Sequence, residues 1–348
     1  MKKVVAVMIA AVMILSLCTM IRTTAKADED ITLSFATFWM ENETDSEIFA
    51  KPWMDMISQA CAEKGYNVEF ECYWGGSLCS VVEAFKAAQD GTADITLFLT
   101  GMPGNFVTEL GLQYPWNGVN IKNPSLIYET LYQEFPEIQE EYKGTHVLAT
   151  LVEGGQQYNS NKQFATFEEA QNMGMLVSGL GEISATIFAK FNWSPVSTLP
   201  DEVYSALERG LIDGTGGTSK SIISNHWNEV TKYRYTNLDV VNQMVSIVMN
   251  EDVWNDLPEE VQEVFTYYGS GGEFNIGQWY DEQIAKCEEE IEPQLGMEIV
   301  NLDQAEIEKF QAAVDEAADE WAAASDANGL PGSKLIERMR ELVAEQAD

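Results

Sequence analysis

Basic residues and histidine are scarce in this chain. Its 348 residues hold 2 histidines and 20 Lys and Arg against 56 Asp and Glu, so the formal net charge is −36. Such an acidic chain is repelled by phosphate backbones and anionic bilayers, which argues against nucleic-acid binding. Imidazole is the usual general base and metal ligand at neutral pH, so few histidines also argue against catalysis. We therefore expect a binding protein without a cofactor or a metal site.

Motifs that carry chemistry are missing as well. The segment 214–221 (GTGGTSKS) resembles a phosphate loop, but a serine replaces the glycine required before the lysine, so it predicts a flexible turn. Cysteines are few, and their spacing fits no zinc site. Cys72 and Cys79 flank a Gly-Gly turn and could close a disulfide loop, with buried free thiols as the alternative. The pairing stays open for the four cysteines after the amino terminus, which are Cys61, Cys72, Cys79 and Cys287.

The one long hydrophobic run lies at the amino terminus. Two lysines precede an apolar stretch over residues 4–17, which is shorter than the roughly 20 residues of a membrane-spanning helix. Ala25 and Ala27 frame an A-x-A cleavage site, so residues 1–27 are predicted to be a secretory signal peptide. A lipoprotein signal that uses Cys18 is the alternative. Cleavage removes 4 basic residues and no acid, so the charge deepens from −36 to −40, and we expect the protein in the periplasm or on the outer face of the cell membrane.

The composition is otherwise that of a globular protein, with 45% hydrophobic and 11% aromatic residues. Strand and helix patterns alternate, which predicts an α/β fold with a parallel sheet covered by helices on both faces. The first series has strands at 31–37, 67–73 and 94–99 and helices at 45–63 and 80–90, and a second series covers 147–212. The two series of strands and helices predict two α/β lobes.

The remainder of the chain is predicted to be mostly helical from Glu273 onward. Breaks are expected near 296–301 and 329–332, where glycines interrupt the pattern. The acidic run 288–290 predicts a solvated helix face, because it lacks the spacing of a calcium loop.

Five segments resemble the solute-binding proteins of tripartite ATP-independent (TRAP) transporters, the DctP-like family. The most characteristic is 201–214 (DEVYSALERGLIDG). The others follow in the family's order at 78–94, 172–177, 228–233 and 249–262. A single segment is weak evidence, whereas five in register are specific and span nearly all of the chain after the signal peptide.

The resemblance implies an α/β fold of the two-lobed periplasmic-binding-protein type (class II-like), with a hinge cleft and a long helix, about 273–294, crossing both lobes. Lobe I would hold 28–154 plus 243–282, and lobe II would hold 155–242 plus 283–348. It further implies a receptor that closes over a small organic solute and presents it to the membrane permease subunits of a TRAP transporter. We expect a monomer that binds no nucleic acid.

The departures from the family concern the ligand. Most members bind a carboxylate through arginines, because a guanidinium and a carboxylate form two parallel hydrogen bonds. The matching positions here are Gln157 and Ser178, and the family's asparagine falls at Gly217. Gln157 and Ser178 are neutral hydrogen-bonding residues. The sequence therefore predicts a ligand that is neutral or partly aromatic.

Apolar and aromatic residues are expected around these positions, because ligands of open parallel sheets sit beyond the carboxyl ends of the strands. Core packing is the alternative for each of them. The candidate ligand-binding residues are Trp39, Trp74, Leu99, Met102, Tyr114, Gln157, Ser178, Trp193 and Gly217.

Three alternatives remain open at this point. The first is the same receptor with a carboxylate ligand, held by helix N-termini, backbone amides and Lys or Arg donors from elsewhere. The second is a secreted two-lobed hydrolase that uses two carboxylates. The third is a sensing adaptor that signals to a membrane kinase.

Overall fold

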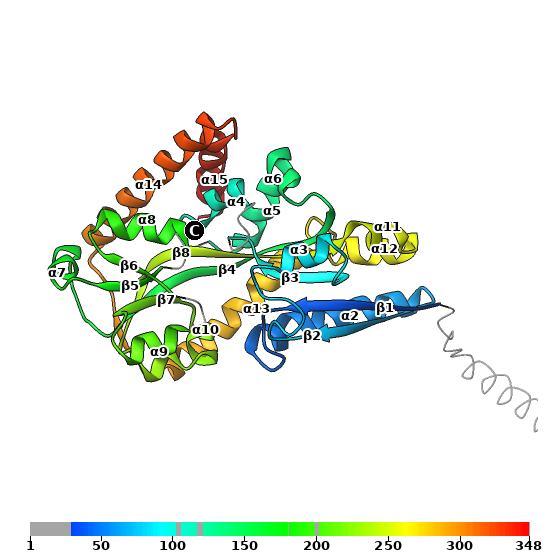
Figure 1. Cartoon of the computed structure of the whole chain (residues 1–348), viewed down its shortest axis with the longest axis horizontal. Coiled ribbons are helices and arrows are strands. Elements are labelled where there is room, and N and C mark those ends of the chain that lie inside the picture. Colours follow the sequence, from blue (N-terminus) through cyan, green and yellow to red (C-terminus); the bar gives the residue numbers. More distant parts are fainter. Residues whose placement is uncertain (1–28, 102–105, 117–120, 180, 199–201, 348) are drawn as a thin grey trace, which may run out of the picture.

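A computed structural model describes residues 29–101, 106–116, 121–179, 181–198 and 202–347. The predicted signal peptide and Met102 lie outside these residues. Figure 1 shows an elongated molecule with two α/β lobes, one around β1 to β3 and the other around β5 to β7. The two-lobed α/β class predicted from the sequence is confirmed.

The elements follow the chain in an alternating order. The strands are β1 (Glu29–Thr37), β2 (Tyr66–Tyr73), β3 (Ile95–Leu99), β4 (Thr145–Ser160), β5 (Leu176–Gly179), β6 (Ser194–Ser197), β7 (Gly214–Gly217), β8 (Tyr233–Asn250) and β9 (Glu298–Val300). The helices are η1 (Ser46–Ala50), α2 (Lys51–Glu63), α3 (Ala84–Gln89), α4 (Val107–Leu110), η2 (Gly111–Gln113), α5 (Pro124–Glu134), α6 (Pro136–Glu141), α7 (Phe167–Asn172), α8 (Glu182–Lys190), α9 (Val203–Glu208), α10 (Ser219–Ser224), η4 (Trp227–Glu229), α11 (Glu251–Asp256), α12 (Glu259–Tyr267), α13 (Ile276–Ile291), η5 (Glu292–Gln294), α14 (Gln304–Ala327) and α15 (Gly332–Gln346).

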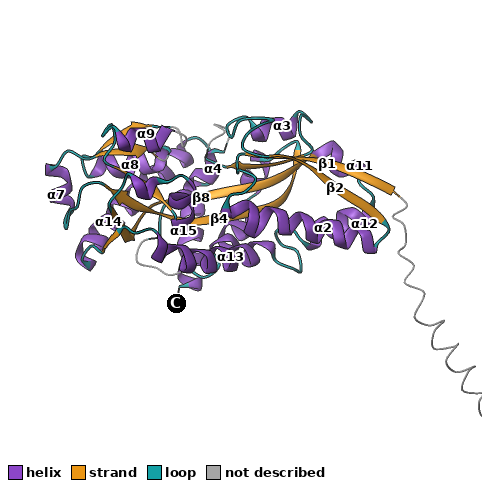
Figure 2. Ribbon diagram, turned by 90° about the horizontal axis from the view of Figure 1, so that it is seen from below, coloured by secondary structure: helices purple, strands orange, loops and turns teal. Residues whose placement is uncertain are grey.

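The sheet is mixed, which corrects the expectation of a parallel one. Its order is β2-β1-β3-β8-β4-β7-β5-β6, with β9 on β8. The pairs β1–β2, β1–β3, β5–β6 and β5–β7 are parallel, as the alternating pattern predicts. The pairs β3–β8, β4–β7 and β4–β8 are antiparallel. The long strands β4 and β8 pass through the middle of the molecule and join the two parallel parts of the sheet (Figure 2).

The ladder between β4 and β8 is irregular near its middle. Its register shifts between Val152 and Gly154 and again between Gly155 and Gln157. At Gly155 a Cβ would lie 2.6 Å from a carboxylate oxygen of Asp239, so only glycine allows this approach. Bulges of this kind bend a strand and raise its twist. The two long strands therefore change direction where they pass from one lobe to the other.

Helix α13 crosses both lobes, as the resemblance implies, and Figure 1 shows it passing between them. The side chain of Asn275 caps it by accepting a hydrogen bond from the backbone N–H of Gln278, 3.0 Å away. On the side of β1 to β3, Asp281 accepts hydrogen bonds from the backbone N–H and the hydroxyl of Ser125, at 3.0 and 2.6 Å. The helix also packs against α5, β4 and α10.

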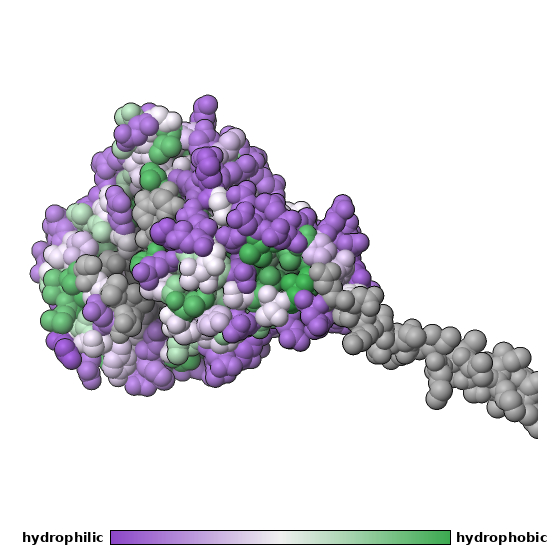
Figure 3. Space-filling view, turned by 45° about the vertical axis from the view of Figure 1, so that its right-hand side comes forward, coloured by the Kyte–Doolittle hydropathy of each residue, from purple (hydrophilic) through white to green (hydrophobic). Residues whose placement is uncertain are grey.

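Two large hydrophobic cores hold the lobes. One lies under β1 to β3 and α2, with Trp53 fully buried in it. The other extends from β4 and β8 to α8, α14 and α15, with Trp193 and Phe310 among its members. The space-filling view in Figure 3 shows a mostly hydrophilic surface with smaller apolar patches. Among the described residues, no helix is both long and apolar enough to cross a membrane.

One local expectation is wrong, and one alternative that the sequence left open is decided. The segment 214–217 is the buried strand β7 and not a flexible turn. Its glycines serve close packing, because a Cβ at Gly214 would lie 2.5 Å from the carbonyl oxygen of Asn159. The disulfide loop is also not formed: Cys61, Cys72, Cys79 and Cys287 are all free thiols. Met54 contacts Cys72 through its sulfur at 3.7 Å, so Cys72 packs against α2 instead.

Candidate functional site

A pocket of about 540 Å³ lies where β4 passes α13, and we call it the junction pocket. Its volume is within the range of small-molecule sites, roughly 300–1,000 Å³. Its walls are strongly acidic, with five Asp and Glu against one lysine. The lining residues are Ile121, Lys122, Pro124, Val152, Glu153, Gly154, Gly155, Gln157, Thr218, Thr236, Asp281, Ile284, Ala285, Glu288, Glu289 and Glu292.

A buried lysine lies beside this pocket. Lys220, on α10, is 2% exposed and forms an ion pair with Asp45, which lies between β1 and α2. Its Nζ is also 3.9 Å from Glu153 Oε1 and 3.4 Å from the hydroxyl of Tyr280 on α13. Burial alone would lower the pKa of Lys220, but attraction by Asp45 and Glu153 outweighs it and raises the pKa. Lys220 therefore stays charged and ties α10 to the loop after β1.

The carboxylates around Lys220 outnumber it. Burial raises the pKa of Glu153 above its ordinary range, against the opposing effect of Lys220 and a hydrogen bond from Trp39. Burial likewise raises the pKa of Glu43 to about 7. Together with Asp45, three acids surround one ammonium group. The cluster consequently carries excess negative charge once these acids ionise.

A buried arginine lies beside the first residue of α10. Arg234, on β8, is 0% exposed, and each of its five N–H donors has an acceptor within the protein. Its Nε lies 3.0 Å from both oxygens of Glu292, which supplies the opposite charge. The other acceptors are the side-chain oxygens of Gln157, Asn159 and Ser219 and the carbonyl oxygen of Gly217. The guanidinium is thus saturated by the chain itself.

The acidic face of α13 is part of the same polar system. Glu288 accepts hydrogen bonds from the backbone N–H groups of Ser219 and Lys220, at 3.0 and 3.1 Å. These are the first residues of α10, whose N–H groups have no partner inside the helix. The expectation of a wholly solvated face over 288–290 is therefore wrong for Glu288, which is 27% exposed.

The hydrogen-bonding residues predicted for the site lie on adjacent strands. Gln157 lines the junction pocket, and its side-chain oxygen accepts a hydrogen bond from Arg234. Gly217 is its pairing partner on β7. Ser178, on β5, is 1% exposed, and its hydroxyl lies 2.5 Å from that of Thr198. Gln157 is the only one of the predicted residues among the described lining of this pocket.

The predicted aromatic and apolar residues lie mainly in the cores. Trp39 and Leu99 are buried in the core under β1 to β3, and Trp74 is partly buried against it, beneath the ammonium group of Lys51. Tyr114 and Trp193 belong to the other large core. Of these residues, Trp39 contacts the acids around Lys220, because its side chain forms a hydrogen bond with Glu153.

Sequence reasoning missed Lys220 and Arg234. Lys220 lies in the segment that was interpreted as a turn, and Arg234 lies in an aromatic stretch, Tyr233–Tyr235. A signal was present for Arg234, because a single arginine inside an apolar strand pattern is rarely left unpaired. Its partners, however, come from β4, β7, α10 and η5, which no sequence pattern connects to it.

Two α/β lobes joined by long crossing strands and a helix, with a polar pocket at their junction, define a solute receptor of the periplasmic-binding-protein type. The family model DctP, "Bacterial extracellular solute-binding protein, family 7", matches residues 35–324. The chain therefore belongs to this family of solute-binding receptors, whose members are not enzymes.

Several known proteins are similar to the chain. A solute-binding protein of Albidiferax ferrireducens is 24% identical over 260 residues, which are 70% of this chain and 72% of that protein. A marine metagenome TRAP solute-binding protein specific for aromatic acid ligands, solved with metahydroxyphenylacetate, has a TM-score of 0.80 at 19% identity, covering 91% of this chain and 99% of its own. A TRAP solute-binding protein of Rhodoferax ferrireducens, solved with copurified benzoate, has a TM-score of 0.80 at 21% identity, covering 91% and 98%.

Proposed function

We propose that this protein is the extracytoplasmic receptor of a TRAP-type importer, working as a monomer in the periplasm or on the outer face of the cell membrane. It closes over a small organic solute that is uncharged and partly aromatic, and it presents the closed form to the permease subunits. Family membership and the likeness to solved TRAP receptors support the receptor role. The aromatic ring is supported by the ligands of those two solved proteins, metahydroxyphenylacetate and benzoate.

The uncharged ligand is supported by the pairing of the two buried cations. Arg234 already binds Glu292, and Lys220 already binds Asp45. A solute carboxylate would have to displace one of these acids in a low-dielectric environment, and separating a buried ion pair is costly. An amide or hydroxyl needs no such displacement, and the side chains of Gln157 and Ser178 suit it. We therefore propose Gln157, Ser178, Gly217 and the neighbouring Trp39 as contacts of an uncharged solute.

The hinge is proposed to lie at the irregular part of the β4–β8 ladder. Gly154 pairs with Gln243 and Gly155 with Asn242, and both pairs fall between register shifts. These two pairs coincide with the predicted boundaries, which end lobe I at 154 and begin its second segment at 243. Gly154 has φ +93°, a conformation that other residues rarely adopt. Rotation about this part of the ladder would leave both parallel sheets intact.

A thermal-shift screen with matched acids and amides tests the proposal. The pairs are benzoate and benzamide, mandelate and mandelamide, and 3-hydroxyphenylacetate and its amide, added to the protein without residues 1–27. A ligand present at about 100 times its Kd adds about 2.7 kcal/mol to the unfolding free energy. We expect amides to raise the Tm and their acids to leave it unchanged. The Gln157→Met variant should abolish the amide shift, whereas Gln278→Met, on the exposed surface of α13, should preserve it.

An aromatic acid is the second candidate ligand, and the acids bound by the two solved neighbours favour it. In that case only the acids raise the Tm, and Lys220→Met abolishes the shift because the ammonium group would be their binding partner. Shifts with acids alone would disprove the uncharged ligand while leaving the receptor role intact. Hydrolysis of any amide to its acid would contradict the receptor role itself.

A further inference from the structure

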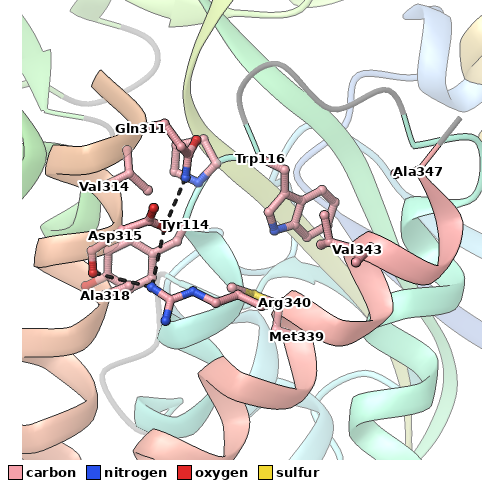
Figure 4. Close-up of a pocket in the computed structure, with 12 residues that line it drawn as sticks. Tyr114, Trp116, Gln311, Val314, Asp315, Ala318, Met339, Arg340, Val343 and Ala347 are labelled. Atoms are coloured by element: carbon pink, nitrogen blue, oxygen red, sulfur yellow. Dashed lines mark hydrogen bonds and ion pairs between the residues drawn. The ribbon is translucent and has the colours of Figure 1, made fainter. Parts of the chain in front are cut away.

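A second pocket lies between the segment 114–116 and the helices α14 and α15. We call it the helical pocket, and its volume is about 400 Å³. Figure 4 shows Tyr114 and Trp116 facing side chains from both helices. Most of the lining is apolar. The lining residues are Tyr114, Pro115, Trp116, Gln311, Val314, Asp315, Ala318, Met339, Arg340, Val343, Ala344 and Ala347.

Two buried polar atoms in this lining have no hydrogen-bond partner within the described chain. They are the indole Nε1 of Trp116, a donor, and the side-chain oxygen of Gln311, an acceptor. The amide of Gln311 cannot simply turn over, because its nitrogen donates to Asp315 Oδ1 at 3.2 Å. Buried indole N–H groups and amide oxygens normally have partners. Two of opposite polarity in the lining of one pocket point to a partner other than the described residues.

The charged groups of the helical pocket are already paired. Arg340 binds Asp319 at 2.9 Å and Asp315 at 3.4 Å, and the hydroxyl of Tyr114 donates to the carbonyl oxygen of Ala317 at 3.0 Å. Of the fully buried polar atoms in this lining, one donor and one acceptor therefore have no partner among the described residues. A ligand that matches these two atoms carries both an acceptor and a donor and needs no charge.

The helical pocket is separate from the junction pocket. The described linings share no residue. A β-bridge between Ile121, which lines the junction pocket, and Ala347, which lines the helical pocket, lies at their boundary. A ligand in one pocket would therefore leave the walls of the other in place.

We propose that the helical pocket is a second binding site, which takes a small, uncharged cyclic compound with an adjacent hydrogen-bond acceptor and donor, such as a lactam. The ring packs against the apolar residues of α14 and α15. Trp116 donates to the acceptor of the ligand, and Gln311 accepts from its donor. The site is independent of the solute that the junction pocket binds.

Titration calorimetry with 2-quinolinone, a bicyclic lactam, tests this proposal on the protein without residues 1–27. We expect binding with a Kd of about 1 mM or tighter, as for a fragment of this size. Trp116→Phe keeps an aromatic ring but removes the N–H and should weaken binding about tenfold. N-methyl-2-quinolinone, which lacks the donor for Gln311, should bind about tenfold more weakly to the unsubstituted protein.

Two tryptophan insertions locate the ligand. Ala344→Trp adds a bulky ring at an exposed position in the wall of the helical pocket and should abolish binding. Ala312→Trp, at an exposed position of α14 outside the lining, should not change it. Absence of binding at millimolar 2-quinolinone, unchanged binding in Ala344→Trp, or equal affinity for the N-methylated compound would each overturn the proposal. Loss of binding in Gln157→Met alone would place the ligand in the junction pocket and overturn it as well.

Discussion

The two pockets differ in how their polar groups are satisfied. Beside the junction pocket, the buried Lys220 pairs with Asp45, and the buried Arg234 pairs with Glu292 and donates to the carbonyl oxygen of Gly217. At the helical pocket, the charges are paired near the surface and two neutral polar atoms have no partner in the described chain. The polar groups at the junction pocket thus hold distant segments of the chain together. The two neutral atoms at the helical pocket could instead form hydrogen bonds with a ligand. Deletion of a polar group should consequently be costly at the first and nearly free at the second.

The largest effect is expected for Lys220→Met. Removal of the ammonium group leaves Asp45 and Glu153 buried without their counter-charge, which typically costs about 3–5 kcal/mol. Urea unfolding measures the loss. Lys286→Met, at an exposed position of α13, is the control and should change the unfolding free energy by less than about 0.5 kcal/mol. Equal stability of the two variants would show that Lys220 is not holding the junction together.

The pH dependence of a third polar site extends the comparison, because its buried acid is paired with no cation among the described residues. Glu109 is 0% exposed, and burial raises its pKa from 4.5 to about 8, although a hydrogen bond from Tyr128 opposes the shift. Its contribution to stability is therefore complete below pH 4.5 and is lost as the pH rises through 8.

Glu109→Gln removes this dependence. Between pH 4.5 and 8, the unfolding free energy of the unsubstituted protein should fall relative to that of the variant, by at most about 1.4 kcal/mol per pH unit. Urea unfolding at a series of pH values gives the difference. A difference that stays constant with pH would mean that Glu109 titrates at its ordinary pKa.

A smaller loss is expected for Gln157→Met. The substitution removes one acceptor of the buried Arg234 and leaves an N–H group unpaired, at a cost of about 1–3 kcal/mol. Gln278→Met is the matched control, because Gln278 is exposed on α13 and its side-chain amide donates to Glu282. If both variants unfold at the same urea concentration, the guanidinium has found another acceptor.

The smallest effect is expected for Trp116→Phe. Its N–H has no partner among the described residues, so the unfolding free energy without ligand should change by less than about 1 kcal/mol. Trp53 is the internal comparison, because its Nε1 donates to the carbonyl oxygen of Tyr268 at 3.0 Å. Trp53→Phe should be clearly more destabilising in the same urea experiment. The reverse order would mean that Trp116 has an unseen partner within the chain.

The sequence predicted the parts of the fold that follow from local periodicity. The strands near 31–37 and 67–73 and the crossing helix after Glu273 appear as β1, β2 and α13. The long strand β8 was not recognised, because polar residues such as Asp239 and Asn242 interrupt its pattern. These residues lie in the irregular part of the ladder and are required by tertiary contacts.

The candidate site was less predictable than the fold. The sequence predicts that the positions of the family's arginines hold Gln157 and Ser178, and this assignment stays a prediction. It could not show that Arg234 reaches Gln157 from β8, 77 residues further along the chain. Such a contact depends on which strands become neighbours, and neither composition nor spacing encodes that directly.

Helix α13 has a mechanical consequence. Asp281 fastens it to Ser125 near the first sheet, and Glu288, two turns further along, fastens it to the start of α10 near the second. A helix of this length is stiff, and the two attachment points are about 10 Å apart along its axis. If the lobes rotate about the β4–β8 ladder, α13 must bend or release one of its two carboxylate contacts. Its bending would then report the angle between the lobes, so a pair of spin labels at its ends would follow opening in solution.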